Sequence, residues 1–183
     1  MPPTLNSPVL LRQAALSDAL CLAVLAMQVY LDTYAKQGIR PAIARDVLAS
    51  FTESSFSTAI ADKQTKLWVA ERESHLVGFA QVTVGQRHEL APQGHQAELL
   101  RLYVQEPFTG QKIGTWLLKE SEAKALAAGC DVLWLSPWVH NHRALGFYAS
   151  HGYRDHGRTD HVIENESHEN RVYAKQLSAS GTA

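Results

Sequence analysis

Apolar residues near the N-terminus recur with two different periods. The short apolar run Val9–Arg12 predicts a strand. Ser17-Asp18 then provides a predicted N-cap for a long helix, which Gly38 is expected to end. The predicted buried face of this helix carries apolar residues at helical spacing: Leu22, Leu25, Ala26, Val29 and Tyr30.

Two shorter helices and a hairpin are predicted to follow. Pro41–Leu48 begins with a proline, which favours the first turn of a helix, and a short helix is expected near Phe56–Ala61. The runs Lys66–Arg72 and Leu76–Val84 are rich in strand-forming residues. They flank Glu73–His75, so the pattern predicts a β-hairpin there.

The second half of the chain alternates strands and helices. Its predicted elements are a loop at Gly85–Gly94, a strand at Gln96–Val104, a helix at Gln111–Ala128, a strand at Val132–Leu135, a helix at Asn141–His151, strands at Tyr153–Thr159 and Arg171–Leu177, and a frayed tail at Ser178–Ala183. Gly129 and Gly152 fit helix C-caps. The expected fold is a single α+β domain over residues 1–183, with a twisted, mostly antiparallel mixed sheet of about seven strands flanked by helices.

Composition narrows the choice of partners. The chain has 183 residues and a formal charge of -1 with no basic stripe, so nucleic acid is not expected as a partner. The N-terminus shows no charged-then-apolar signal pattern, and no apolar run is judged long enough to cross a membrane. Cys21 and Cys130 are isolated and are predicted to be reduced thiols. A cytoplasmic location is therefore expected.

The most informative segment joins the predicted strand Gln96–Val104 to the predicted helix Gln111–Ala128. Between them, Thr109–Gly114 (TGQKIG) forms a short glycine-bearing loop. The first turn of a helix presents unpaired backbone N–H groups and the positive end of the helix dipole. The segment therefore predicts a phosphate-binding loop.

A second segment lies further along the chain. It consists of Asn141 at a helix start, Ala144 three residues later, the aromatic pair Phe147-Tyr148, and Gly152 before a new strand. Asn141, Ala144 and Tyr148 stand at intervals of three and four residues, so they share one helix face.

These two segments, in this order, resemble the GNAT superfamily of N-acetyltransferases over roughly Trp68–Leu177. The resemblance implies acetyl-CoA as co-substrate and direct acetyl transfer to an amine. It implies that Leu102, Tyr103 and Val104 offer strand backbone groups to the pantetheine arm. It also implies that Asn141 contacts the cofactor, that Tyr148 donates a proton near its sulfur, and that the pyrophosphate is cradled by Thr109, Gly110, Gln111, Lys112, Ile113, Gly114 and Thr115.

Physical chemistry agrees with these implied roles. An unpaired strand edge can bind the amide-rich pantetheine as though adding a strand. Pro137 cannot donate to a β-ladder, so the strand Val132–Leu135 is expected to part from its neighbour about there and leave a slot.

The phosphate loop departs from the family pattern at two places. Thr109 stands where Arg or Gln is usual, and Lys112 replaces a glycine. A left-handed backbone at Lys112 would cost roughly 1–2 kcal/mol. The cation of Lys112 would favour phosphate binding and so partly offset that cost. A solvent-exposed lysine with no binding role is an equal alternative.

Within the superfamily, the chain is most similar to bacterial PaiA-type spermidine/spermine acetyltransferases. The similar features are Leu31–Tyr34, Glu98–Val104, Trp134-Leu135 through Trp138 to Asn141, His156-Gly157, and Ile163–Glu166. Ser136-Pro137 departs from the Gly-Val pair that is usual there.

The chemistry of acetyl transfer selects the catalytic candidates. An alkyl amine with a pKa near 10.4 must lose a proton, which costs roughly 4–5 kcal/mol at pH 7. Glu98, near the start of the central strand, is the expected general base, with Glu71 and Glu89 as alternatives. Tyr148 is the expected donor to the leaving thiolate; a buried core tyrosine is the competing interpretation.

The remaining candidates concern the acceptor and metals. A polycationic acceptor favours carboxylates, of which the sequence offers Glu89, Glu98, Asp155, Asp160, Glu164, Glu166 and Glu169, several of them expected simply to face water. Trp138 is a candidate cation contact, and His156 and His161 could line the acceptor side. The nine histidines show no metal-ligand spacing with the cysteines, so no metal site is expected.

The predicted function is acetyl-CoA-dependent N-acetylation of a small primary amine, with a polyamine as one candidate. A protein α-amine or an aminoglycoside is the alternative acceptor, and a non-catalytic acetyl-CoA sensor is the alternative class. Neither cysteine falls on a motif position, so no acetyl-enzyme is expected. A homodimer is expected only by analogy with relatives.

Overall fold

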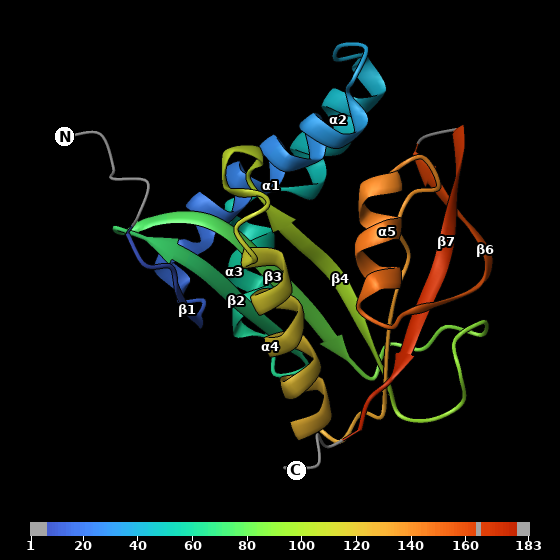
Figure 1. Cartoon of the computed structure of the whole chain (residues 1–183). Coiled ribbons are helices and arrows are strands. Elements are labelled where there is room, and N and C mark those ends of the chain that lie inside the picture. The colour runs from blue at the N-terminus through green and yellow to red at the C-terminus, as the bar shows by residue number, and fades with distance from the viewer. Residues whose placement is uncertain (1–6, 164–165, 179–183) are drawn as a thin grey trace. The chain divides into compact units, whose positions relative to one another are not determined.

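The computed structural model describes residues 7–163 and 166–178. Its seven strands form one mixed sheet in the order β1-β2-β3-β4-β5-β7-β6, which confirms the predicted fold class (Figure 1). By compactness the chain divides into two units, Met1–Gln81 with Arg101–Ser121 and Val82–Leu100 with Glu122–Ala183. Except for Ser178, the predicted tail lies outside the described residues.

The elements follow the predicted order closely. They are β1 Leu10–Gln13, the 3-10 helix η1 Leu16–Asp18, α1 Ala19–Tyr34, α2 Pro41–Ser50, α3 Glu53–Ala61, β2 Thr65–Arg72, β3 His75–Val84, β4 Gln96–Val104, the 3-10 helix η2 Glu106–Phe108, α4 Ile113–Ala127, β5 Val132–Leu135, α5 His142–Ser150, β6 Arg154–Ile163 and β7 Glu166–Gln176.

Asp18 occupies the N-cap position of α1, as predicted, but its side chain has other partners. Asp18 ends a 3-10 turn, and its carboxylate makes no cap hydrogen bond to α1. Instead it accepts from the backbone N–H of Ala15 (2.7 Å) and from Arg12 Nη1 (2.7 Å). The ion pair with Arg12 overrides the local capping preference. The helix also ends at Tyr34, before the predicted stop at Gly38.

The predicted hairpin between β2 and β3 is confirmed. Its turn consists of Glu73 and Ser74, whose φ angles of 48° and 65° are both left-handed. Two consecutive left-handed residues are the geometry of a type I′ turn, which matches the twist of paired strands. His75 already belongs to β3.

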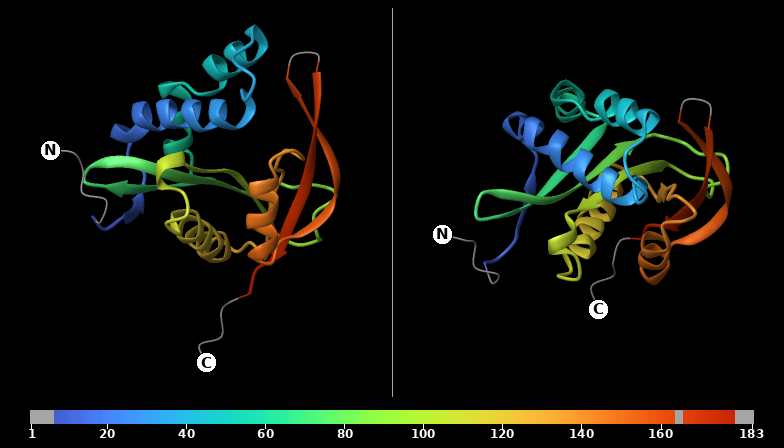
Figure 2. Two further views of the ribbon diagram at one scale, coloured as in Figure 1. Left: turned by 45° about the horizontal axis from the view of Figure 1, so that its top comes forward. Right: turned by 90° about the horizontal axis from the view of Figure 1, so that it is seen from above.

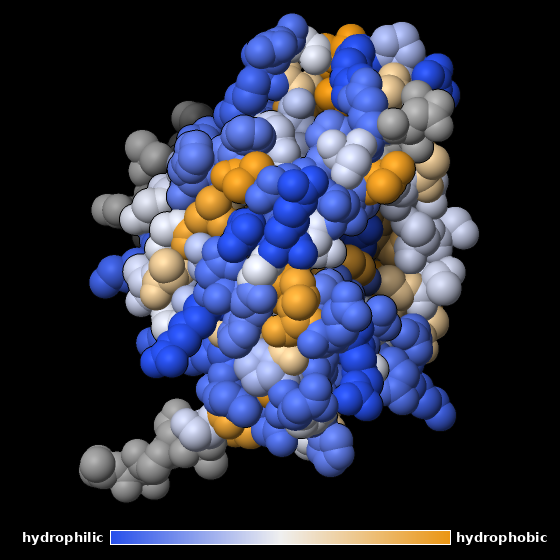
Figure 3. Space-filling model, turned by 90° about the vertical axis from the view of Figure 1, so that its right-hand side faces the viewer, coloured by the Kyte–Doolittle hydropathy of each residue, from blue (hydrophilic) through white to orange (hydrophobic). Residues whose placement is uncertain are grey.

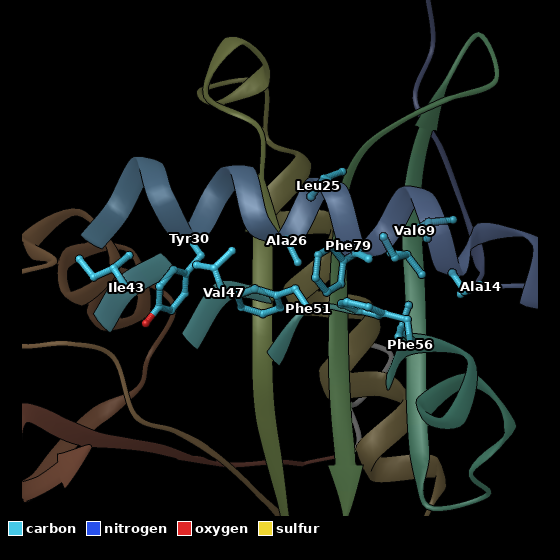
Figure 4. Packing of buried hydrophobic residues seen from close by; sticks show 14 residues of the cluster. Ala14, Leu25, Ala26, Tyr30, Ile43, Val47, Phe51, Phe56, Val69 and Phe79 are labelled. Atoms are coloured by element: carbon cyan, nitrogen blue, oxygen red, sulfur yellow. The ribbon is translucent and has the colours of Figure 1, made fainter. Parts of the chain in front are cut away.

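In the first unit, helices α1, α2 and α3 cover one face of the strands and the start of α4 covers the other (Figures 1 and 2). The core lies under α1, where Ala26 lies above Phe79 and the Tyr30 ring packs edge-on against Phe51 (Figure 4). Thr52 caps α3, accepting a hydrogen bond from the N–H of Ser55, so this helix begins earlier than predicted.

In the second unit, β5 is the central strand. It pairs parallel to β4 over Gln96–Glu98 and antiparallel to β7 over all its four residues. The last two strands are longer than predicted, because β6 and β7 stay paired through their polar ends as far as Ile163 and Glu166. The predicted polar turn between them includes residues 164–165, which lie outside the described residues.

Cross-strand ion pairs join β6 and β7. Arg158 contacts Glu169 (Nη1–Oε2 3.4 Å), and Arg171 contacts Asp155 (Nε–Oδ2 3.0 Å). Such pairs stabilise neighbouring strands without an apolar face. This is why a hydrophobic pattern did not detect the full length of these strands.

The second unit is also braced by Glu122, in the C-terminal half of α4. Its carboxylate accepts from Lys175 Nζ (2.9 Å) and from the Tyr153 hydroxyl (3.0 Å). Burial, followed by the neighbouring Glu122 charge, raises the pKa of Tyr153. The Tyr153 phenol therefore stays protonated and keeps its hydrogen bond to Glu122.

One helical stretch, Leu16–Tyr34, is long and apolar enough to cross a membrane by length and composition alone, contrary to the expectation from sequence. Several of its apolar residues belong to the core described above, which accounts for this composition. The face shown in Figure 3 is mainly hydrophilic, with apolar residues in small separate groups. Cys21 is exposed, Cys130 is buried, and both are free thiols.

Candidate functional site

The predicted site residues belong to two groups. Leu102–Val104 and Thr109–Thr115 lie in the first compact unit, whereas Glu98, Asn141 and Tyr148 lie in the second.

The predicted phosphate loop joins η2 to α4. Gly110 and Lys112 both adopt left-handed backbone conformations, with φ of 75° and 64°. The sequence predicted that the helix starts at Gln111, but α4 begins at Ile113. The left-handed backbone of Lys112 does not fit a right-handed helix, so the helix starts after it. Thr109, the other departure from the family pattern, donates its hydroxyl to the backbone oxygen of Glu106 (2.8 Å).

The start of α4 has the geometry that phosphate needs. The backbone oxygen of Lys112 accepts the first helical hydrogen bond, from Trp116 (3.0 Å). The N–H groups of Ile113 and Gly114 therefore stand in the first helical turn, where no acceptor within a helix is available. Together with the dipole of α4, this turn fits a pyrophosphate.

Arg72 is a residue of this loop region that sequence reasoning missed. It is the last residue of β2, 7% exposed, and its Nη2 donates to Gln111 Oε1 (2.7 Å). Its guanidinium also lies over the Phe108 ring, 5.3 Å from the centroid. A charged residue ending a strand carried no recognisable motif, so only its contacts reveal it.

The strand segment predicted to bind pantetheine is the end of β4. The pairing of β4 with β5 covers Gln96–Glu98, so Leu102, Tyr103 and Val104 lie beyond it on the same strand. The Tyr103 ring packs edge-on against Phe79 (centroids 5.4 Å apart), and burial raises the pKa of its hydroxyl. The side chain is thus part of the core, which leaves the backbone of β4 as the group that can bind.

The chain beyond β5 follows β7 despite Pro137. Trp138 bridges Asn170, and the Pro137 oxygen accepts from the N–H of Arg171 (3.0 Å). Asn170 Nδ2 also donates to the Ser136 oxygen (2.8 Å). Regular β5 pairing ends at Leu135, before Pro137, while the Pro137 carbonyl keeps this segment attached to β7. The slot expected beside Pro137 stays a prediction.

Asn141 and Tyr148 occupy the two ends of α5. Asn141 caps the helix, its Oδ1 accepting from the N–H of Ala144 (3.1 Å). Tyr148 is 8% exposed, and its ring packs against Phe147 and Tyr153 with centroids 5.3 and 5.7 Å away. The helix thus fixes the position of a largely buried phenol.

The candidate bases differ in their surroundings. Glu98 is half-buried on β4, opposite Trp134 in the register with β5. Glu71 is held by Arg12 (Nη2–Oε2 2.6 Å) in the first unit, and Glu89 is exposed. Of these three candidate bases, Glu98 is the one on β4, the strand whose end the resemblance assigns to cofactor binding.

Three of the acidic residues predicted for the acceptor form ion pairs within β6 and β7. Asp155 and Glu169 take part in the cross-strand ion pairs of β6 and β7, and Asp160 contacts Arg158 (2.9 Å). Trp138 packs edge-on against His140 (centroids 5.0 Å apart). Within the described ranges, no group of three or more His, Cys, Asp or Glu residues could hold a metal ion.

Comparison with known proteins identifies the family. The sequence model of the Acetyltransferase (GNAT) family matches residues 31–153. An uncharacterized N-acetyltransferase of Lactobacillus delbrueckii subsp. lactis is 26% identical over 130 residues, 70% of this chain and 74% of that protein. An IAA acetyltransferase of Azospirillum brasilense is 29% identical over 98 residues, 54% and 60% of the two chains.

Solved structures of acetyltransferases share the fold. A PaiA N-acetyltransferase from Thermoplasma acidophilum, solved in complex with coenzyme A, matches with a TM-score of 0.74 at 22% identity, covering 92% of this chain and 99% of that one. The chain belongs to the GNAT family of acetyltransferases. It is an N-acetyltransferase with acetyl-CoA as its acetyl donor.

Proposed function

We propose that this enzyme transfers the acetyl group directly to a primary amine of a small molecule, with a polyamine as the first candidate acceptor. The observation that carries the proposal is the largely buried Tyr148 phenol on α5, whose start Asn141 caps. The likeness to the Thermoplasma PaiA protein and the sequence similarities to PaiA-type enzymes support the polyamine. A cytoplasmic location and a homodimer stay predictions.

In this proposal the coenzyme is held by backbone groups of β4 and of the loop before α4. The loop Thr109–Lys112 and the first turn of α4 bind the pyrophosphate, and the backbone of Leu102–Val104 binds the pantetheine amides. The left-handed Gly110 and Lys112 support this role, because they turn the chain into the helix N-terminus. A backbone N–H of the same strand polarises the thioester carbonyl.

Tyr148 and Glu98 supply the proton chemistry in this proposal. Acetyl-CoA provides an activated acetyl thioester. When the acetyl group is transferred, the CoA thiolate that leaves needs a proton. Tyr148 donates that proton from its hydroxyl, and Asn141 fixes the helix that carries it. Glu98, half-buried on β4, takes the proton that the acceptor amine must lose, directly or through water.

The test is a thiol-release assay with acetyl-CoA and a panel of amines. The panel contains spermidine, spermine, amino acids, an aminoglycoside and a peptide with a free α-amine. Free CoA is measured with a thiol reagent, and acetylated product is identified by mass. A Tyr148→Phe variant run in parallel controls for release without the proposed proton donor.

The outcomes distinguish the candidate acceptors from one another and from a non-catalytic sensor. Release with spermidine and spermine alone supports the polyamine proposal, whereas release with the peptide or the aminoglycoside replaces it with that acceptor. Binding of acetyl-CoA with no release for any amine would favour a sensor. The altered loop positions Thr109 and Lys112 are the features that favour this second candidate.

A further inference from the structure

Arg72 is a buried cation that has no anionic partner among residues 7–163 and 166–178. It is 7% exposed at the end of β2, and its contacts among the described residues are the Gln111 amide oxygen and the Phe108 ring. Its Nε is buried and makes no hydrogen bond in the described part of the chain. By contrast, Arg12 on β1 contacts the carboxylates of both Asp18 and Glu71.

The burial of Arg72 costs free energy unless an anion lies close to its guanidinium. A guanidinium carries five N–H donors and a permanent charge. Burying such a charge is unfavourable unless it is paired and hydrogen-bonded. A neutral amide and an aromatic face compensate only part of that cost at Arg72.

The two residues that Arg72 contacts lie on either side of the turn that contains Gly110. Phe108 ends η2 and Gln111 lies in the loop before α4. The Gln111 amide is held at both ends, since Nε2 donates to the Pro107 oxygen (3.3 Å) while Oε1 accepts from Arg72. Arg72 therefore fixes the segment that includes the left-handed Gly110.

We infer that Arg72 is a positioning residue for the coenzyme phosphates. It holds the loop in its binding conformation through Gln111, and its buried charge adds positive potential beneath the pyrophosphate. The inference rests on the proposed role of Thr109–Thr115 in phosphate binding. The anion that completes the charge balance at Arg72 is then the bound coenzyme.

The experiment measures CoA binding directly by calorimetry for the wild type and for Arg72→Met, Arg72→Lys and Gln111→Ala. Arg72→Met is expected to weaken CoA binding about tenfold or more, equivalent to ~1.4 kcal/mol. Arg72→Lys keeps the charge but lacks the planar guanidinium, so it is expected to recover part of the affinity. Arg12→Met is the matched control, because it removes an ion-paired arginine from the same unit and should leave CoA affinity unchanged.

A phosphate-free donor separates this role from general stability. The KM for acetyl-pantetheine, which lacks the pyrophosphate, should be the same in Arg72→Met and wild type, while the KM for acetyl-CoA rises. In the double variant with Gln111→Ala, the loss should be smaller than the sum of the single losses, because the two side chains act together.

The outcomes that overturn the inference are distinct. Wild-type CoA affinity in Arg72→Met would overturn it, and so would an equal loss for acetyl-CoA and acetyl-pantetheine. If Arg72→Met does not fold, Arg72→Lys and Gln111→Ala carry the same comparison. CoA binding without acetylation of any amine would overturn the proposed function and leave this inference standing.

Discussion

Replacing Lys112 with glycine is expected to stabilise the folded enzyme. Lys112 has a φ of 64°, a conformation that costs a residue with a Cβ roughly 1–2 kcal/mol. Glycine relieves that strain but makes the unfolded chain more flexible, which takes back about 0.4–1 kcal/mol. The net gain is therefore about 0.8 kcal/mol.

The gain is measurable by thermal denaturation. For a chain of this length, 1 kcal/mol corresponds to a shift of roughly 2–4 °C in Tm, so Lys112→Gly should raise Tm by about 2–3 °C. Lys112→Ala is the matched control, because it removes the same charge from the N-terminus of α4 yet keeps the Cβ. The difference between the two variants isolates the backbone strain from the charge.

The same pair of variants tests whether the Lys112 cation helps to bind phosphate. If it does, both variants lose CoA affinity to the same extent, and the loss shrinks at high salt. The strain argument is refuted if Lys112→Gly is no more stable than Lys112→Ala. In that case the left-handed conformation carries no cost at this position.

Three further predictions concern the proton donor, a close strand contact and an ion pair. Tyr148→Phe should lower kcat about a hundredfold or more with little change in CoA affinity, and unchanged turnover would remove Tyr148 from the mechanism. Gly78→Ala places a Cβ 2.8 Å from a backbone oxygen of β4 and should cost about 1–3 kcal/mol in thermal denaturation, whereas Gly146→Ala meets nothing within 4 Å and should gain about 0.5–1 kcal/mol. The hydrogen bond from Arg12 lowers the pKa of Asp18, so its contribution to stability is present above the ordinary pKa of the carboxyl and is lost as pH falls through the lowered value. Asp18→Asn should therefore cost about 1–3 kcal/mol at pH 7, and the gap to the wild type should close in acid; a gap independent of pH would contradict this.

Features whose cause is local were predictable from the sequence. Asn141 caps α5 because its side chain reaches an N–H only three residues away, and Glu73-Ser74 turns because two adjacent residues decide the turn. The loop that turns into α4 was predicted for the same reason, although the helix start was placed two residues early. The left-handed Lys112 could be suspected from the family pattern but not established by it.

Features that depend on distant partners required the tertiary structure. Asp18 has the identity of a helix cap, yet Arg12 on a neighbouring strand captures its carboxylate. The polar ends of β6 and β7 carry no apolar alternation, and the two strands are joined by charges that face each other only once the strands are aligned.

By itself the sequence determined the order of the elements, the two family motifs and the residues they contain, because spacing along the chain controls helix faces, caps and turns. The tertiary structure alone decided that Arg72 meets Gln111, a residue 39 positions away, and that this arginine is buried without a carboxylate partner among the described residues. Such a contact depends on how a strand end and a loop pack together, and no local pattern in the sequence encodes that packing.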